Sequence, residues 1–200
     1  MRQKLQKIII TISKKISILI LLFLLISVPV KTSSQATIKE ISITRITDYV
    51  SQYKGSVVIL QIFGAYCPYS VKEISVINQL GKTYRDYGLK VIVFSRDANK
   101  YDFARFLDDA SIYFEPIWLT SREHEKIITE IAELGGKYKS AIPYTAVINK
   151  GNRIVYQRTG YSGDYNTYAA WIEKSLSEKY VEPSENEIPP SRWEFISSEK

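Results

Sequence analysis

The chain has only one cysteine, Cys67, and one histidine, His124, among its 200 residues. A single cysteine excludes an intramolecular disulfide, so the thiol is either buried and inert or free to react with another molecule. His124 lies in the charged segment 122–126, which is typical of a solvated helix surface. Without a histidine or cysteine cluster or a glycine-rich phosphate loop, the sequence predicts no metal and no cofactor.

Acidic residues are absent from residues 1–36, although this stretch carries six basic side chains. The whole chain has 27 basic and 21 acidic residues, so removing those six leaves a balance of 21 against 21. The formal net charge of +6 therefore belongs to the N-terminal stretch alone. A near-neutral body gives no electrostatic reason to expect a nucleic-acid partner.

The basic N-terminal stretch has the pattern of an export signal. Basic residues up to Lys15 precede an uncharged apolar run at 16–30, and small residues at Ser34 and Ala36 resemble a signal-peptidase site. We expect residues 1–36 to be a cleaved signal, with a retained N-terminal anchor as the alternative. The apolar run is short for a span, which needs about 20 apolar residues. Both alternatives predict an exported body, periplasmic or extracellular, with membrane contact only if the segment is retained.

Residues 37–181 read as one α/β domain with a mixed sheet and helices on both faces. Apolar runs of strand length alternate with segments of helical periodicity, and a turn at 150–152 joins two final strands. This order predicts parallel strands first and an antiparallel hairpin last. We expect strands at 41–43, 56–63, 90–95, 116–119, 144–148 and 153–158, and helices near Asp48 and at 68–87, 101–109, 121–134 and 164–179. The polar, proline-containing residues 182–200 are expected to form a flexible tail.

The sequence Cys67-Pro68-Tyr69-Ser70 stands between a buried strand and a helix. A thiol at a helix N-terminus faces unpaired N–H groups and the positive end of the helix dipole, which favour thiolate over thiol. The thiolate is the species that attacks disulfides. Pro68 suits the first helical position. The alternative is a buried structural cysteine, a common fate of a free thiol.

Two segments of the chain resemble the thioredoxin-like superfamily. Residues 57–73 are similar to its active-site segment, particularly in the exported TlpA-like and cytochrome-maturation branch. Residues 141–145, followed by two strands around the turn at 149–152 and by Gly160, resemble the family's cis-proline loop and terminal hairpin. The similarity covers roughly residues 50–180, in the family's order and spacing. It implies a thioredoxin fold.

The resemblance also implies roles for particular residues. Cys67 would be the attacking cysteine, and Ser70 stands at the position of the resolving cysteine, so the site is Cys-x-x-Ser. Pro143 would be cis and face Cys67, although an ordinary trans turn proline is the alternative. The backbone of Ile142 would then pair with an extended client strand. The substrate-binding surface would comprise Tyr66, Pro68, Tyr69, Ile142, Pro143 and Tyr144.

Three further positions in the active-site segment bear on the function: two differ from related proteins, and one is a charged residue near the site. Gln61 stands where the best-known thioredoxins carry a buried Asp, and a neutral residue is coherent with the absent resolving thiol. Gly64 stands where the peroxiredoxin branch has Thr or Ser, which argues against a peroxidase. We expect Glu73 on the solvated helix surface, and the alternative is that it faces the site from one turn's distance.

These observations predict an extracytoplasmic thiol–disulfide exchange protein that acts through a single thiol, as a reductase or isomerase. Without a second thiol the site stops at a mixed disulfide on Cys67 until another thiol arrives. The expected partners are a client protein with a disulfide or thiol and an external thiol reductant. One alternative is a redox-inactive thioredoxin-fold binding module, so an enzymatic role stays open. Another is a structural partner held by a permanent intermolecular disulfide.

Overall fold

The computed structural model of the chain describes residues 37–108, 111–120 and 124–181. The expected signal segment 1–36 and the expected tail 182–200 lie outside the described residues. Both expectations therefore stay predictions.

The described residues form a mixed six-stranded sheet in the order β1-β4-β3-β2-β5-β6. β1, β4, β3 and β2 are parallel to their neighbours, whereas β5 runs antiparallel to β2 and β6 antiparallel to β5. The predicted fold class, α/β with parallel strands first and a C-terminal hairpin, is confirmed. The strands are β1 (Lys39–Ile41), β2 (Val57–Phe63), β3 (Leu89–Ser95), β4 (Glu115–Leu119), β5 (Tyr144–Ile148) and β6 (Ile154–Thr159).

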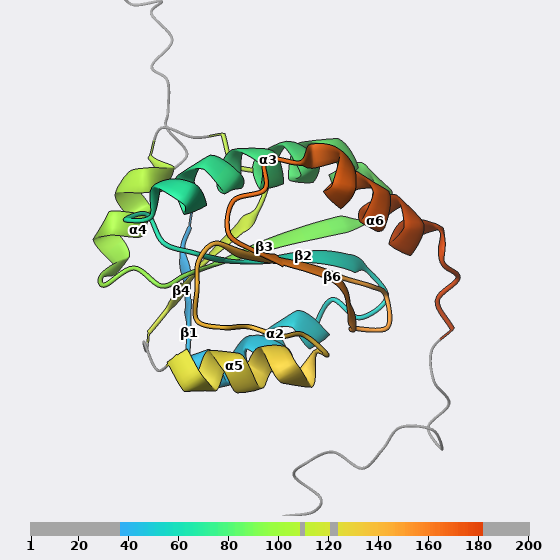
Figure 1. Cartoon of the computed structure of the whole chain (residues 1–200), viewed down its shortest axis with the longest axis horizontal. Helices are drawn as coiled ribbons and strands as arrows, with labels where there is room; N and C mark the ends of the chain where they lie inside the picture. Colours follow the sequence, from blue (N-terminus) through green and yellow to red (C-terminus); the bar gives the residue numbers. More distant parts are fainter. Residues whose placement is uncertain (1–36, 109–110, 121–123, 182–200) are drawn as a thin grey trace, which may run out of the picture. The chain divides into compact units, whose positions relative to one another are not determined.

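Helices cover both faces of this sheet, as Figure 1 shows. Helices α3, α4 and α6 lie on one face, and α2 and α5 lie on the other. The helices are α2 (Ile46–Ser51), α3 (Pro68–Tyr84), α4 (Lys100–Leu107), α5 (His124–Glu133) and α6 (Tyr165–Ser177), with short 3₁₀ helices η1 (Ile43–Arg45) and η2 (Arg85–Tyr87).

β2 is the central strand, and all seven of its residues are buried. Alternate residues of a strand point to opposite faces, so β2 contributes to two apolar layers. Val58, Leu60 and Ile62 pack with the helices α2 and α5. Val57, Ile59 and Phe63 pack with α3, α4 and α6. The continuous apolar run in the sequence therefore has its physical explanation in a strand covered on both sides.

Most element boundaries differ from the expected ones by only a few residues. The first strand lies at Lys39–Ile41 rather than 41–43, because residues Ile43–Arg45 form η1 instead. α4 begins at Lys100, since the Asn99 side chain accepts a hydrogen bond from the Asp102 N–H and caps the helix. α3 ends at Tyr84 and continues as η2 to Gly88, whose φ of 96° ends the helical run.

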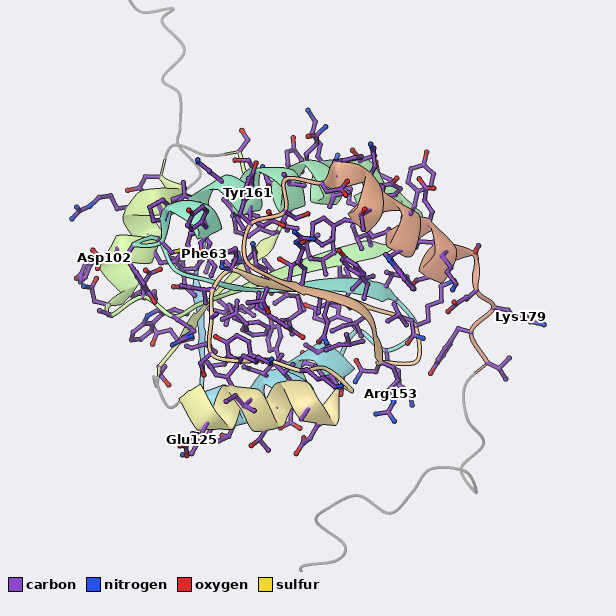
Figure 2. The ribbon with its side chains drawn as sticks, in the orientation of Figure 1. Phe63, Asp102, Glu125, Arg153, Tyr161 and Lys179 are labelled. Carbon is purple, nitrogen blue, oxygen red and sulfur yellow. The ribbon has the colours of Figure 1, made fainter. Side chains whose placement is uncertain are left out.

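Cys67 follows β2. Because β2 and β3 are parallel, their C-terminal ends lie at the same end of the sheet, and the segment after β3 begins there. The β5–β6 turn lies at the opposite end of the strands, since β5 is antiparallel to β2 and Val58 pairs with Ile148. Figure 2 shows Phe63, the last residue of β2, toward one end of the sheet and Arg153 of the hairpin turn toward the other. Within the described residues, no helix has both the length and the hydropathy that crossing a bilayer requires.

Candidate functional site

Cys67 is the N-cap residue of α3, and its side chain is half-buried. Its N–H donates to the Gly64 carbonyl at 3.0 Å, closing the turn after β2, and its carbonyl accepts from the Val71 N–H at 3.1 Å. Pro68 occupies the first turn of the helix, where a missing N–H costs no intrahelical bond. The sulfur is therefore held in a defined place by a turn and a helix start, and solvent still reaches it.

The Cys67 thiol donates a hydrogen bond to the Ile142 carbonyl, with 3.7 Å between sulfur and oxygen. The side chain makes no hydrogen bond to the amides of the first helical turn. Because a carbonyl oxygen is an acceptor, this contact belongs to the protonated thiol and not to the thiolate. The Ile142–Pro143 peptide bond is cis. The two segments that the sequence pairs in function are thus in contact, 75 residues apart along the chain.

Ile142 reaches Cys67 because β5 pairs with β2. Tyr144 at the start of β5 pairs with Ile62 near the end of β2, so the residues just before Tyr144 lie beside the turn after Phe63. The Gly160 N–H donates to the Pro143 carbonyl at 2.7 Å and fixes the loop from the β6 side. In the described part of the chain, no hydrogen bond involves the Ile142 N–H, and its carbonyl accepts only from the thiol.

Two tyrosines stand exposed beside the sulfur in the sequence. Tyr66 is 65% exposed and Tyr69 is 60% exposed, and Pro68 between Cys67 and Tyr69 is exposed as well. A Cβ atom on Gly64 would lie 2.7 Å from the Tyr66 ring and 2.8 Å from the Ile142 Cδ1 atom. Tyr66 and Ile142 therefore meet over Gly64. We call Tyr66, Cys67, Tyr69, Ile142 and Pro143 the Cys67 site.

The expectation that Tyr144 lines this surface is wrong. Its side chain is fully buried, its hydroxyl donates to Gln157 Oε1 at 2.8 Å, and its ring packs edge-on against Tyr138 at 5.1 Å. Burial also raises the pKa of Tyr144 above its usual value. The physical reason is strand alternation: Tyr144 is the first residue of β5 and points into the layer between the sheet and α5. Its position next to Pro143 in sequence could not reveal that direction.

Ser70 and Gln61 are buried polar residues on the α3 side of β2. Both are 0% exposed. Gln61 lies on the same face of β2 as Ile59 and Phe63, which pack against α3. Ser70 lies on α3, one turn before Ile74. Among the described residues, neither the Ser70 hydroxyl nor the Gln61 amide has a hydrogen-bond partner. The position of the family's resolving cysteine is thus occupied by the Ser70 hydroxyl, which makes no hydrogen bond to any described residue.

Glu73 is buried, which corrects the expectation of a solvated surface position. It is 0% exposed, and its carboxylate accepts hydrogen bonds from the Ser162 N–H at 2.9 Å, the Gly163 N–H at 3.2 Å and the Tyr168 hydroxyl at 2.6 Å. Burial and this carboxylate raise the pKa of Tyr168. Glu73 therefore ties α3 to the start of α6. Its partners lie about 90 residues away, so helical periodicity alone could not identify them.

The sequence did not single out the polar residues Ser95, Arg96 and Asp97. Ser95 ends β3, and Arg96 and Asp97 follow it at the same end of the sheet as Cys67. All three are buried. Asp97 accepts from the Ala65 N–H at 2.8 Å, and Arg96 donates to the Tyr138 hydroxyl at 2.5 Å. Burial raises the pKa of the Asp97 carboxyl, an effect that hydrogen bonds from Ser95 and from the backbone partly oppose. A run of polar residues directly after an apolar strand was the signal that could have identified them.

The close approach at Gly64 makes a testable prediction. In Gly64→Ala, the added methyl group displaces the Tyr66 ring and the end of the Ile142 side chain, both of which are flexible side-chain atoms. We expect the midpoint of thermal unfolding to change little and the rate of Cys67 reaction with a peptide disulfide to fall by at least about fivefold, since a misplacement of about 1 Å can cost far more. Gly151→Ala in the hairpin turn is the control, and equal rates in both variants would contradict the packing described.

In the described residues, no group of three His, Cys, Asp or Glu side chains is placed to hold a metal ion. The Cys67 site presents one half-buried thiol, a neighbouring carbonyl and exposed tyrosine rings.

Comparisons with known proteins agree with the fold. Three solved structures, a thiol:disulfide interchange protein of Chlorobium tepidum, a thiol:disulfide interchange protein of a Bacteroides species and a thiol-disulfide isomerase of Corynebacterium glutamicum, each share 18% identity over 64% of this chain. The similarity covers 84%, 78% and 86% of those chains, with TM-scores of 0.52, 0.51 and 0.52. No curated protein matches the chain in sequence.

A family model described as AhpC/TSA matches residues 34–157, which is more than half of the chain and includes β2, Cys67 and Pro143. Together with the mixed sheet and the structural neighbours, this match shows that the chain belongs to the AhpC/TSA family of the thioredoxin-like superfamily.

Proposed function

We propose that this protein is an extracytoplasmic thiol–disulfide exchange protein that acts through Cys67 alone, as a reductase or isomerase. The observation that carries the proposal is the placement of one accessible thiol at the N-cap of α3, 3.7 Å from the Ile142 carbonyl. Ser70, one turn further on, supplies a hydroxyl where a second thiol would be needed for self-release. The arrangement supports one chemical step and an external partner for the next.

In the first step the Cys67 thiol loses its proton to solvent, and the thiolate attacks one sulfur of a client disulfide. The client S–S bond breaks, a new S–S bond joins Cys67 to the client, and the other client sulfur leaves as a thiolate. If the released client thiolate attacks the adduct, the original disulfide forms again. If a different client cysteine attacks it, a new client disulfide forms, Cys67 is released, and the client is rearranged without net oxidation or reduction. If two external thiols resolve the adduct and end as a disulfide, the client is reduced.

The Ile142 backbone supplies the proposed docking point for the client. Its N–H has no hydrogen-bond partner among the described residues, and its carbonyl is engaged only by the thiol that the reaction consumes. An extended client segment can pair with these two groups in the manner of an added strand. The exposed rings of Tyr66 and Tyr69 would contact side chains that flank the client cysteine.

The neighbours in fold support the same class of activity, since they are thiol:disulfide interchange proteins and a thiol-disulfide isomerase. A peroxidase is disfavoured because Gly64 stands three residues before Cys67, where a hydroxyl side chain would be required. The space above Gly64 is already filled by Tyr66 and Ile142, so no side chain takes that role there.

The proposed activity is tested by reduction of insulin and by refolding of a scrambled disulfide protein, each with glutathione as the external thiol. We expect acceleration of both reactions by the native protein and none by Cys67→Ala, which keeps the fold and removes the sulfur. Binding of reduced client peptides without any acceleration would instead identify a redox-inactive binding module.

The proposed location depends on the N-terminal segment and has its own test. Because Ser34-Gln35-Ala36 follows the basic stretch and the apolar run at 16–30, we expect the mature chain to begin at Thr37 and to lie outside the cytoplasm. N-terminal sequencing of the native protein measures this. Recovery of an intact N-terminus in a membrane fraction would identify a retained anchor, and recovery in the cytosol would contradict the proposed location.

A further inference from the structure

The segment Ser95, Arg96 and Asp97 contacts the turn that precedes Cys67 and the loop that precedes Ile142. Ser95 is the last residue of β3, which pairs with β2 in parallel, and Arg96 and Asp97 follow it, so the segment lies beside the turn that carries Cys67. The exposed fractions are 0% for Ser95, 8% for Arg96 and 2% for Asp97. Burying a carboxylate and a guanidinium costs free energy unless their hydrogen bonds are satisfied. The partners of these groups are therefore the key to what the segment does.

Asp97 holds the turn that precedes Cys67. Its Oδ1 atom accepts from the Ala65 N–H at 2.8 Å. Its Oδ2 atom accepts from the Ser95 hydroxyl at 2.6 Å, and its carbonyl accepts from the Trp118 indole N–H at 3.0 Å. The carboxylate is thus fixed from the β3 and β4 side and binds the backbone two residues before the reactive sulfur.

Arg96 holds the loop that precedes Ile142. Its guanidinium donates to the Tyr138 hydroxyl at 2.5 Å and to the Ser140 carbonyl at 3.2 Å. Its backbone N–H donates to the Phe63 carbonyl at 2.8 Å, at the end of β2. Ser140 has a φ of 58°, in the left-handed region that a serine rarely adopts. A loop with such a residue needs outside contacts to keep its conformation, and Arg96 provides two of them.

We propose that Arg96 and Asp97 are positioning residues that together set the distance and orientation between the Cys67 sulfur and the Ile142 backbone. Asp97 fixes one segment of the site and Arg96 fixes the other, and the two residues are adjacent in the chain. Neither touches the sulfur. Their effect falls on clients that must engage both segments at once, and this inference rests on the proposed exchange function.

The proposal distinguishes two classes of reactant. A small disulfide, such as 2-hydroxyethyl disulfide, needs only the exposed sulfur. A peptide disulfide must place its sulfur at Cys67 and pair its backbone with Ile142. Loosening either segment therefore penalises the peptide and spares the small reagent. A purely structural role of Arg96 would change both reactions together, through loss of folded protein.

The test measures both rate constants for the native protein, Arg96→Met, Arg96→Lys, Asp97→Ala and the surface control Arg105→Met. We expect Arg96→Met and Asp97→Ala to react with the small disulfide within about twofold of the native rate and with the peptide at least about tenfold more slowly, because misplacement of about 1 Å can cost 100-fold. Arg96→Lys should be intermediate, since an ammonium keeps the charge but lacks the planar fork. Arg105→Met should match the native protein.

Two results would overturn the proposal in distinguishable ways. If the native protein forms no adduct with the peptide, the proposed function fails and the inference fails with it. If the native protein reacts but the variants lose both rates equally, or lose neither, then the exchange function stands and the positioning role does not. Circular dichroism of each variant establishes that it is folded, and Arg96→Lys provides a folded comparison if Arg96→Met is not.

Discussion

Replacing Ser70 with cysteine is expected to turn a site that holds its adduct into one that releases it. In Ser70→Cys, we expect the lifetime of the mixed disulfide between Cys67 and a client peptide to be at least about 100-fold shorter than in the native protein, without any external thiol. The reason is proximity: an intramolecular thiol attacks at an effective concentration far above that of any added reagent. The variant should then contain an internal disulfide and one released client.

The geometry favours this outcome. Cys67 is the N-cap of α3 and Ser70 lies in its first turn, three residues on, so the two side chains share one side of the helix start. The Ser70 hydroxyl is buried, and no described residue holds it by a hydrogen bond. Substituting a less polar thiol therefore leaves no described partner unsatisfied, and the reduced variant should be at least as stable as the native protein.

Mass spectrometry of the peptide adduct over time measures the release, with Ser70→Ala as the matched control. The alanine variant removes the hydroxyl without adding a thiol, so its adduct should persist as long as the native one. Equal persistence in Ser70→Cys, with no internal disulfide, would show that the side chains at 67 and 70 do not meet. The site would then fit a binding module better than an exchange protein.

Glu73→Gln is expected to give the largest loss of stability among the single changes considered, about 2–3 kcal/mol. The native carboxylate accepts three hydrogen bonds, from Ser162, Gly163 and Tyr168, in a fully buried position. The glutamine amide presents an N–H₂ group that cannot accept, so at least one buried donor loses its partner. Urea unfolding followed by circular dichroism measures the difference in the free energy of unfolding.

Glu125→Gln is the control for this change. Glu125 is exposed on α5, at the position labelled in Figure 2. The free energy of unfolding of Glu125→Gln should therefore stay within about 0.5 kcal/mol of the native value. If Glu73→Gln were as stable as Glu125→Gln, the contacts between α3 and the start of α6 would contribute little to the fold. The carboxylate would then need another role to explain its burial.

The fold was largely predictable because its strongest signals are local. The run at 57–63 is apolar on both faces, and glycines 55 and 64 bound it, so a central strand was the natural prediction. The hairpin followed from the turn at 150–152. The sequence missed β1 by two residues, since a three-residue edge strand carries little periodic signal and is held by pairing with β4.

The sequence predicted the parts of the candidate site that depend on residue type. It did not predict those that depend on the direction in which a side chain points. Cys67 and Ile142 were paired from sequence, and they are in contact. Tyr144 was misplaced because only the pairing of β5 with β2 decides which way its ring points. Glu73, Arg96 and Asp97 were missed or misjudged because their partners are distant in sequence. A polar run after an apolar strand marks Arg96 and Asp97 in the sequence, but the hydrogen-bond partners of such residues are known only when the chain is folded.

We expect Cys67 to attack a client disulfide and the reaction to halt at the mixed disulfide between Cys67 and the client. The most direct measurement is the intact mass of the native protein after reaction with a peptide disulfide, taken before and after addition of glutathione. The expected result is one peptide half attached at Cys67, stable until the thiol is added and then released with recovery of the free cysteine. A native protein whose mass never changes, although Cys67 is folded in place and accessible to iodoacetamide, would contradict it.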